Sequence, residues 1–73
     1  MTIVTHNNTL VNYDNISCIC IVREEDMYVV CGILPSGMHH ELGKYQTEEA
    51  AKHAINYIVG GGIKNRAAVL EML

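Results

Sequence analysis

One segment of the sequence joins glycines to basic side chains, a combination that suits anion binding. Three consecutive glycines occupy positions 60–62, and a short segment with a lysine and an arginine follows them. Glycines that open a helix leave backbone N–H groups free, the helix N-terminus adds partial positive charge, and arginine can contact a phosphate through two hydrogen bonds. The spacing is not that of a P-loop. Two interpretations stay open: a hinge with solvated basic side chains, or an anion site formed by Gly61, Gly62, Lys64, Asn65 and Arg66.

Three cysteines and two adjacent histidines have side chains that could bind a metal: Cys18, Cys20, Cys31, His39 and His40. Structural zinc sites favour cysteines on a turn with two to four residues between them, whereas a single residue separates Cys18 from Cys20 in an apolar segment. Adjacent residues of a strand point to opposite faces, so the two histidines cannot serve one site in one copy. We therefore expect the cysteines to pack as small hydrophobic side chains, and we expect no metal site.

The same region offers one pair for acid–base chemistry. His39 and Glu41 fall on one face of an expected strand, but no nucleophile accompanies them. We expect no catalytic residues, no cofactor and no enzyme activity. His6 and His53 are expected at the surface.

Composition limits the class of protein. The chain has 73 residues, of which 49% are hydrophobic, so it is one small globular domain and not a disordered tail. No apolar run is long enough for a membrane span, and the first residues do not resemble a secretion signal. The net charge of −3 argues against nonspecific binding to nucleic acid. Three cysteines without a secretion signal favour reduced thiols and a cytoplasmic location.

Size predicts self-association. A domain this short buries only about 60% of the surface of its unfolded chain. The sequence has no Trp and no Phe, and an odd number of cysteines cannot form a complete set of disulfides. We expect the remaining apolar surface to be buried against another copy of the chain, in a homo-oligomer.

The first part of the chain predicts an antiparallel meander of about five short strands, over residues 2–6, 9–12, 16–23, 27–34 and 38–45. Turns are expected as a two-residue turn at Asn7-Asn8, a corner at Tyr13-Asp14-Asn15, a charged turn at residues 23–26 and a tight turn at Pro35-Ser36-Gly37. The segment 16–23 is apolar on both faces, so we expect the helix to cover one face and a partner to cover the other.

Helical spacing begins at Thr47, whose hydroxyl is a good N-cap. Glu48 and Lys52 are four residues apart in the favourable order, and Gly60 is expected to end the helix in the left-handed conformation. A second, short helix is expected over residues 63–73. The fold class is therefore α+β. Residues 1–59 form a meander-plus-helix domain, and residues 60–73 form a glycine hinge and a C-terminal helix that belongs to the same domain or serves oligomerisation.

The segment Glu41-Leu42-Gly43-Lys44-Tyr45-Gln46-Thr47-Glu48-Glu49-Ala50-Ala51-Lys52, together with Leu10-Val11-Asn12-Tyr13-Asp14-Asn15-Ile16, resembles small uncharacterised proteins of Gram-positive bacteria and their phages. The resemblance covers residues 1–59 and implies a meander-plus-helix fold and a phage or prophage setting. Small phage proteins of this size are often inhibitors or ligand traps that act against host defence.

These observations favour a non-enzymatic, homo-oligomeric binding protein that sequesters a small anionic, nucleotide-like ligand between subunits and so counters host defence. The residues of the glycine–basic segment would hold the phosphates, and Tyr45, or alternatively Tyr28 or Tyr57, would stack on a base. The alternative is a protein-interaction inhibitor that docks on a host protein through an exposed strand face or the C-terminal helix.

Overall fold

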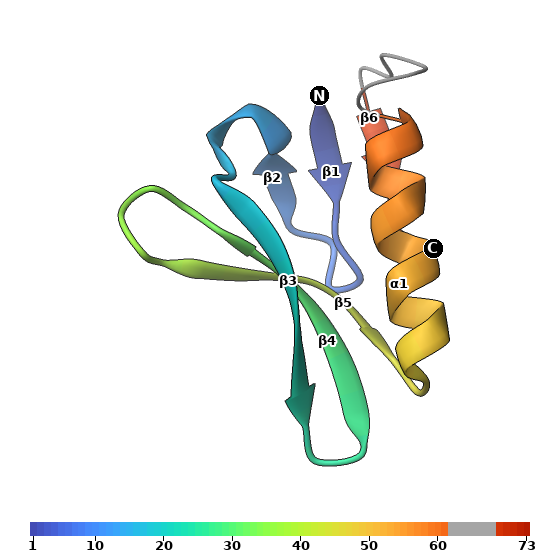
Figure 1. Ribbon diagram of the computed structural model, residues 1–73. Coiled ribbons are helices and arrows are strands. Elements are labelled where there is room, and N and C mark those ends of the chain that lie inside the picture. The colour runs from blue at the N-terminus through green and yellow to red at the C-terminus, as the bar shows by residue number, and fades with distance from the viewer. Residues whose placement is uncertain (62–68) are drawn as a thin grey trace.

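The computed structural model describes residues 1–61 and 69–73. The strands are β1 (Thr2–Val4), β2 (Leu10–Asn12), β3 (Cys18–Glu24), β4 (Met27–Ile33), β5 (His39–Tyr45) and β6 (Val69–Glu71); a 3-10 turn, η1 (Tyr13–Asn15), and one helix, α1 (Glu48–Val59), complete the described elements (Figure 1). The class is α+β, as the sequence predicts. The strands form two sheets and not one meander: β2-β1-β6, and β3-β4-β5.

The chain leaves the first sheet at η1, where a corner was expected. The side chain of Asn12 accepts a hydrogen bond from the backbone N–H of Asp14, and Ile16 N–H bonds back to the carbonyl of Tyr13. This turn sends the chain into β3 of the second sheet. The single meander was wrong because the turn separates the first hairpin from the other three strands.

Each of the three hairpin turns has one residue in the left-handed region, at or beside the polar residues that the sequence predicted for the turn. Between β3 and β4 only Glu25 and Asp26 remain outside the strands, and Glu25 has φ 53°. The turn before β5 uses Gly37 at φ 90°. The registers are antiparallel throughout β3-β4-β5, as expected, with a bulge in the β4–β5 pairing at Val30/Cys31.

The loop of the first hairpin is longer than the predicted two-residue turn. The strand register ends at Val4 opposite Leu10. Beyond it, the N–H of Thr5 donates to the carbonyl of Thr9 at 2.9 Å, and the hydroxyl of Thr5 accepts from the N–H of Thr9 at 3.0 Å. Asn8 takes φ 61°, which asparagine tolerates.

The helix α1 begins as predicted. The Thr47 hydroxyl accepts from the N–H of Ala50 at 3.1 Å, and Lys52 forms an ion pair with Glu48 at 2.9 Å. Its end differs from the prediction, because Gly60 has φ −61° and ψ −45° and continues the right-handed turn. The N–H of Gly60 bonds to the carbonyls of Asn56 and Tyr57, so the helix does not need a left-handed cap.

The expected C-terminal helix is wrong for residues 69–73; the rest of that segment, residues 62–68, lies outside the described residues. Val69–Glu71 form the strand β6, which runs parallel to β1 and pairs Ile3 with Leu70. Leu70 is buried, and the N–H of Met72 bonds to the carbonyl of Val4. A strand is favoured over a helix here because it forms hydrogen bonds with the backbone groups at the open edge of β1 and also buries Leu70.

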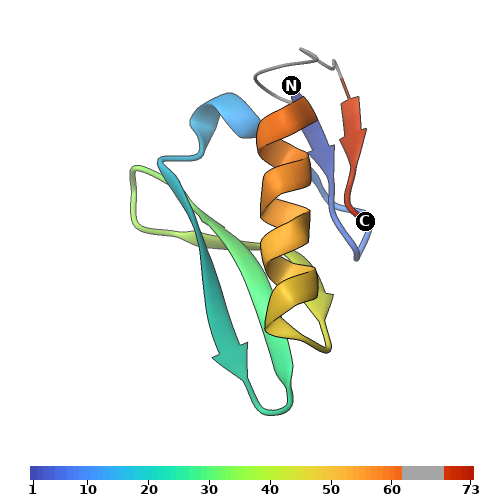
Figure 2. The ribbon, with the colours of Figure 1, turned by 45° about the vertical axis from the view of Figure 1, so that its right-hand side comes forward.

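The core lies where both sheets meet the helix, which crosses in front of them in Figure 2. Its fully packed members come from five strands and the helix: Ile3, Val11, Val30, Leu42, Ala51, Ile58 and Leu70. Ile19 and Ile21 of β3 pack against this cluster. On the other face of β3, Cys18 and Val22 remain exposed in the single copy.

Candidate functional site

The structure describes two of the predicted ligand-binding residues, Gly61 and Tyr45. Gly62, Lys64, Asn65 and Arg66 lie outside the described residues. Gly61 is buried, and a Cβ atom at this position would lie 2.7 Å from Cδ1 of Leu70. The described part of the glycine run therefore packs the end of α1 closely against β6.

Tyr45 takes part in a junction that closes the fold. Its hydroxyl donates a hydrogen bond to the carbonyl oxygen of Leu73 at 3.0 Å, and its ring lies 5.0 Å from the His6 ring, tilted by 55°. Burial raises the pKa of Tyr45 above its ordinary value. If Tyr45 stacked on a nucleobase as predicted, its ring would do so while its hydroxyl and ring also hold this junction.

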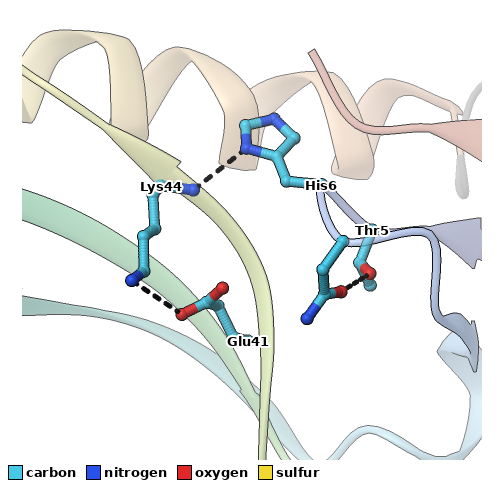
Figure 3. A network of polar contacts seen from close by, with 5 residues as sticks. Thr5, His6, Glu41 and Lys44 are labelled. Atoms are coloured by element: carbon cyan, nitrogen blue, oxygen red, sulfur yellow. Dashed lines mark hydrogen bonds and ion pairs between the residues drawn. The ribbon is translucent and has the colours of Figure 1, made fainter.

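The histidine of the junction joins three parts of the chain. His6 Nδ1 accepts a hydrogen bond from the backbone N–H of Lys44 at 3.1 Å (Figure 3). Its Nε2 contacts the carbonyl oxygen of Leu73. Because Nδ1 accepts, the neutral ring carries its proton on Nε2 and donates it to Leu73. The junction thus ties the first hairpin loop to β5 and to the end of β6. It has the character of a structural clamp.

Tyr45 and Gly61 lie at opposite ends of α1. Tyr45 precedes the helix and Gly61 follows it, so a helix of 12 residues separates them by about 18 Å along its axis. The two residues are therefore not neighbours within one copy.

A different set of described residues surrounds an open hollow of about 380 Å³ at the beginning of α1. Ile21 and Arg23 come from β3, Tyr28 from β4 and Glu48 from the first turn of the helix. Arg23 and Tyr28 are direct cross-strand partners, and the guanidinium carbon lies 5.7 Å from the centre of the Tyr28 ring. The hollow therefore combines a flat aromatic side chain, a cation, a carboxylate and an aliphatic wall.

Among the charged side chains of this hollow, Arg23 is the one available to a ligand. Glu48 is paired with Lys52, and this hydrogen bond raises the pKa of Lys52. Arg23 forms no ion pair with any residue that the structure describes. Tyr28 was expected from the sequence as a possible stacking residue, whereas Arg23 and Glu48 were not expected in a ligand site. The feature that brings Arg23 to Tyr28 is their pairing across the short hairpin, and this pairing is known only once the register of β3 on β4 is known.

A second hollow, of about 440 Å³, lies between η1, the start of β3 and the end of α1. Asp14, Ser17 and Cys18 contribute polar atoms, and no basic side chain is among its lining residues. An anion would gain no charged partner from the described lining of this hollow.

The cysteines are free thiols, and within residues 1–61 and 69–73 no cluster of three metal-binding side chains occurs. Cys31 is buried, and burial, followed by the proximity of Cys20 and Glu41, raises the pKa of its thiol. Cys18 is exposed and is not the core residue that the sequence predicted. His39 is exposed at the start of β5, and His40 is half-buried.

In the described parts of the chain, the one helix is too short to cross a membrane. No family model matches this chain, and neither a characterised protein nor a solved structure resembles it significantly.

Proposed function

We propose that this protein is a non-enzymatic binding protein that sequesters a small anionic, nucleotide-like ligand. The observation that carries the proposal is the hollow in which Arg23 lies over Tyr28 beside the first turn of α1. Arginine binds phosphates through charge-assisted hydrogen bonds, and aromatic and guanidinium planes are the surfaces on which nucleobases stack.

Each lining residue would have its own role. A flat ring would cover Tyr28 and Ile21, while the guanidinium of Arg23 would hold the anionic group. The carboxylate of Glu48 would accept hydrogen bonds from ring N–H groups, since it can bond to more than one donor.

The glycine–basic segment is a second proposed source of phosphate contacts. Lys64 and Arg66 supply two of the five basic residues of the chain, and Gly61, Gly62 and Asn65 would provide the backbone and amide groups around them. Self-association, a cytoplasmic location and action against the defence of a bacterial host belong to the same proposal and rest on composition and on the resemblance to phage-type proteins.

Calorimetric titration with a panel of linear and cyclic nucleotides tests this function. We expect one class of nucleotide to bind and to be recovered unchanged. Arg23→Ala should weaken binding by about tenfold or more, because a charge-assisted hydrogen bond is lost. The double variant Lys64→Ala/Arg66→Ala reports on the glycine–basic segment, and Lys44→Ala, an exposed lysine outside the hollow, is the matched control. The absence of binding by every nucleotide would refute the proposal.

One observation favours the alternative of a protein-interaction inhibitor: β3 exposes Cys18 and Val22 on the face opposite the core. The other half of that alternative, docking by a C-terminal helix, does not hold for residues 69–73, which contain β6. Recovery of one stoichiometric host protein by the tagged chain, unaffected by Lys64→Ala/Arg66→Ala, would support this second function.

A further inference from the structure

The strand β3 is the longest unpaired edge in the described structure. It has seven residues, lies at one side of the sheet β3-β4-β5, and no strand among the described residues pairs with its other side. The edges of the first sheet, β2 and β6, have three residues each. The edge of β5 is partly occupied, because Leu42 accepts a hydrogen bond from the N–H of His6 and Lys44 donates one to the His6 ring.

The register shows which backbone groups of β3 are free. The N–H of Leu34 bonds to the carbonyl of Met38, so Ile33–His39 and Cys31–Glu41 are non-hydrogen-bonded pairs with β5. The backbone groups of Cys31 and Ile33 must then point toward β3.

Because Cys31 pairs with Cys20 and Ile33 pairs with Cys18, the even-numbered residues of β3 bond to β4. The two-residue turn leads to the same parity, since Glu24 and Met27 flank it as a hydrogen-bonded pair. The N–H and C=O groups of Ile19, Ile21 and Arg23 therefore point to the open edge.

Apart from Arg23 and Glu24 at its end, this edge lacks the features that keep strand edges apart. Charged side chains, prolines and bulges usually protect an exposed edge from pairing with another chain. Residues 18–22 carry no charge, β3 contains no proline, and its pairing with β4 runs without a bulge from Cys18 to Glu24.

We propose that β3 pairs antiparallel with β3 of a second copy, about a twofold axis at Ile21. In this register Ile21 faces its own equivalent, Ile19 faces Arg23 of the second copy, and Arg23 faces Ile19 of the second copy. Since each hydrogen-bonded pair exchanges two bonds, these three pairs provide about six backbone hydrogen bonds. The two sheets β3-β4-β5 become one continuous sheet.

Charge and apolar surface favour this self-pairing. The charged segment, residues 23–26, lies at one end of the hairpin, so an antiparallel twofold arrangement places the two charged ends far apart. The same register sets Val22, which is 41% exposed, directly opposite Cys20 of the second copy. Both residues thereby gain an apolar neighbour.

The pairing also completes the proposed ligand site, and this part of the inference rests on the proposed function. Ile21 and Arg23 line the hollow and belong to the pairing edge. In the dimer, Ile21 of the second copy stands beside Ile21, and Ile19 of the second copy stands beside Arg23. The hollow thus becomes a site between copies, walled by apolar side chains of both.

Sedimentation of the full chain over a range of concentrations tests the edge. We expect a concentration-dependent dimer. Arg23→Pro removes an N–H that points to the edge, and by symmetry it does so twice, so it should weaken the dimer by about tenfold or more. Arg23→Ala loses the same side chain but keeps the N–H, and its dimer should remain close to that of the wild type. A wild-type monomer at all concentrations, or equal dimers of both variants, would overturn the proposal.

A cross-link tests the register without relying on a proline variant. Val22→Cys places a thiol opposite Cys20 of the second copy in a non-hydrogen-bonded pair, where Cα atoms are about 4.5 Å apart and a disulfide can form. Mild oxidation should convert most of this variant to a covalent dimer. The control is Leu10→Cys, at a residue that is 69% exposed on β2, and it should stay at the wild-type level. Equal cross-linking of both variants would refute the register.

The two measurements separate this inference from the proposed function. A dimer that cross-links at position 22 but binds no nucleotide would leave the edge pairing intact and refute the ligand. A monomer that binds nucleotide through Arg23 would do the reverse.

Discussion

At the scale of single residues, the junction at His6 shows how polar groups close a small fold. The His6 ring accepts from the N–H of Lys44 through one nitrogen and donates to Leu73 through the other. Tyr45 donates to the same carbonyl oxygen. Two side chains thus satisfy one backbone oxygen and connect the first hairpin loop and Leu73 to β5. Removing either donor should loosen the end of β6.

Replacing Tyr45 by phenylalanine tests this junction. Tyr45→Phe should lower the free energy of unfolding at neutral pH by about 1 kcal/mol, because the hydrogen bond to Leu73 is lost. Tyr57→Phe, at an exposed tyrosine of α1, should change it by less than about 0.5 kcal/mol. Urea denaturation followed by circular dichroism measures both values, and equal effects of the two variants would contradict the role of Tyr45.

The pH dependence of Tyr45→Phe has a definite sign. Burial raises the folded-state pKa of Tyr45, so the folded protein holds this proton more tightly than the unfolded chain does. The contribution of Tyr45 is complete below the pKa of an unfolded tyrosine, about 10, and it is lost as the pH rises through the higher folded-state value. The stability difference between wild type and variant should therefore shrink as the pH rises from about 10 to the folded-state pKa of Tyr45. A constant difference would show that Tyr45 does not titrate in this way.

At the scale of elements, the end of α1 shows two adjacent glycines with different roles. Gly60 is in the right-handed helical conformation with open space around its missing Cβ, whereas Gly61 lies against Leu70 of β6. The first glycine could carry a side chain, and the second is required by the close approach of helix and strand.

Alanine at these two positions should change the stability of the protein in opposite directions. Gly60→Ala should stabilise the protein by about 0.4–1 kcal/mol, because alanine restricts the unfolded chain and fits the observed φ. Gly61→Ala should destabilise it by about 1–3 kcal/mol, because the added methyl group would lie 2.7 Å from Leu70 Cδ1. Thermal denaturation of the two variants makes the comparison. If Gly61→Ala were as stable as Gly60→Ala, the contact between α1 and β6 would be looser than described.

At the scale of the whole molecule, β6 decides how the first sheet is built. It pairs in parallel with β1 and places Leu70 in the same core as Ile3 and Ile58. The first and last strands of the chain lie side by side, so the first hairpin depends on residues almost 70 positions away in the sequence. Loss of β6 should weaken β1 and β2 as well.

Truncation of Leu70 measures this dependence. Leu70→Ala should cost about 2–5 kcal/mol, as buried leucines do, whereas Val69→Ala, at a residue that is 61% exposed, should cost much less. Hydrogen exchange should show faster exchange at the amides of β1 in Leu70→Ala. Unchanged protection of β1 would mean that β6 is not needed for the first sheet.

The sequence by itself determined the elements that follow from local chemistry. The hydroxyl of Thr47, the apolar spacing after it and the Glu48–Lys52 pair predicted the helix, and the structure has each of these contacts. The turns before β4 and β5 were also predicted, because turn residues act on their immediate neighbours. Gly43 also has a local explanation, since a Cβ at this position would lie 2.8 Å from the Tyr45 hydroxyl.

Only the tertiary structure decided where distant segments meet. The apolar spacing of residues 63–73 fits a short helix, but β1 offers an open edge that a strand at Val69–Glu71 can satisfy, and local spacing carries no information about that edge. The hollow beside Arg23 likewise requires the register of β3 on β4 and the position of Glu48 above it. Local hydrogen bonds are encoded by neighbours in the chain, whereas pairing and burial depend on which surfaces the folded chain leaves unsatisfied.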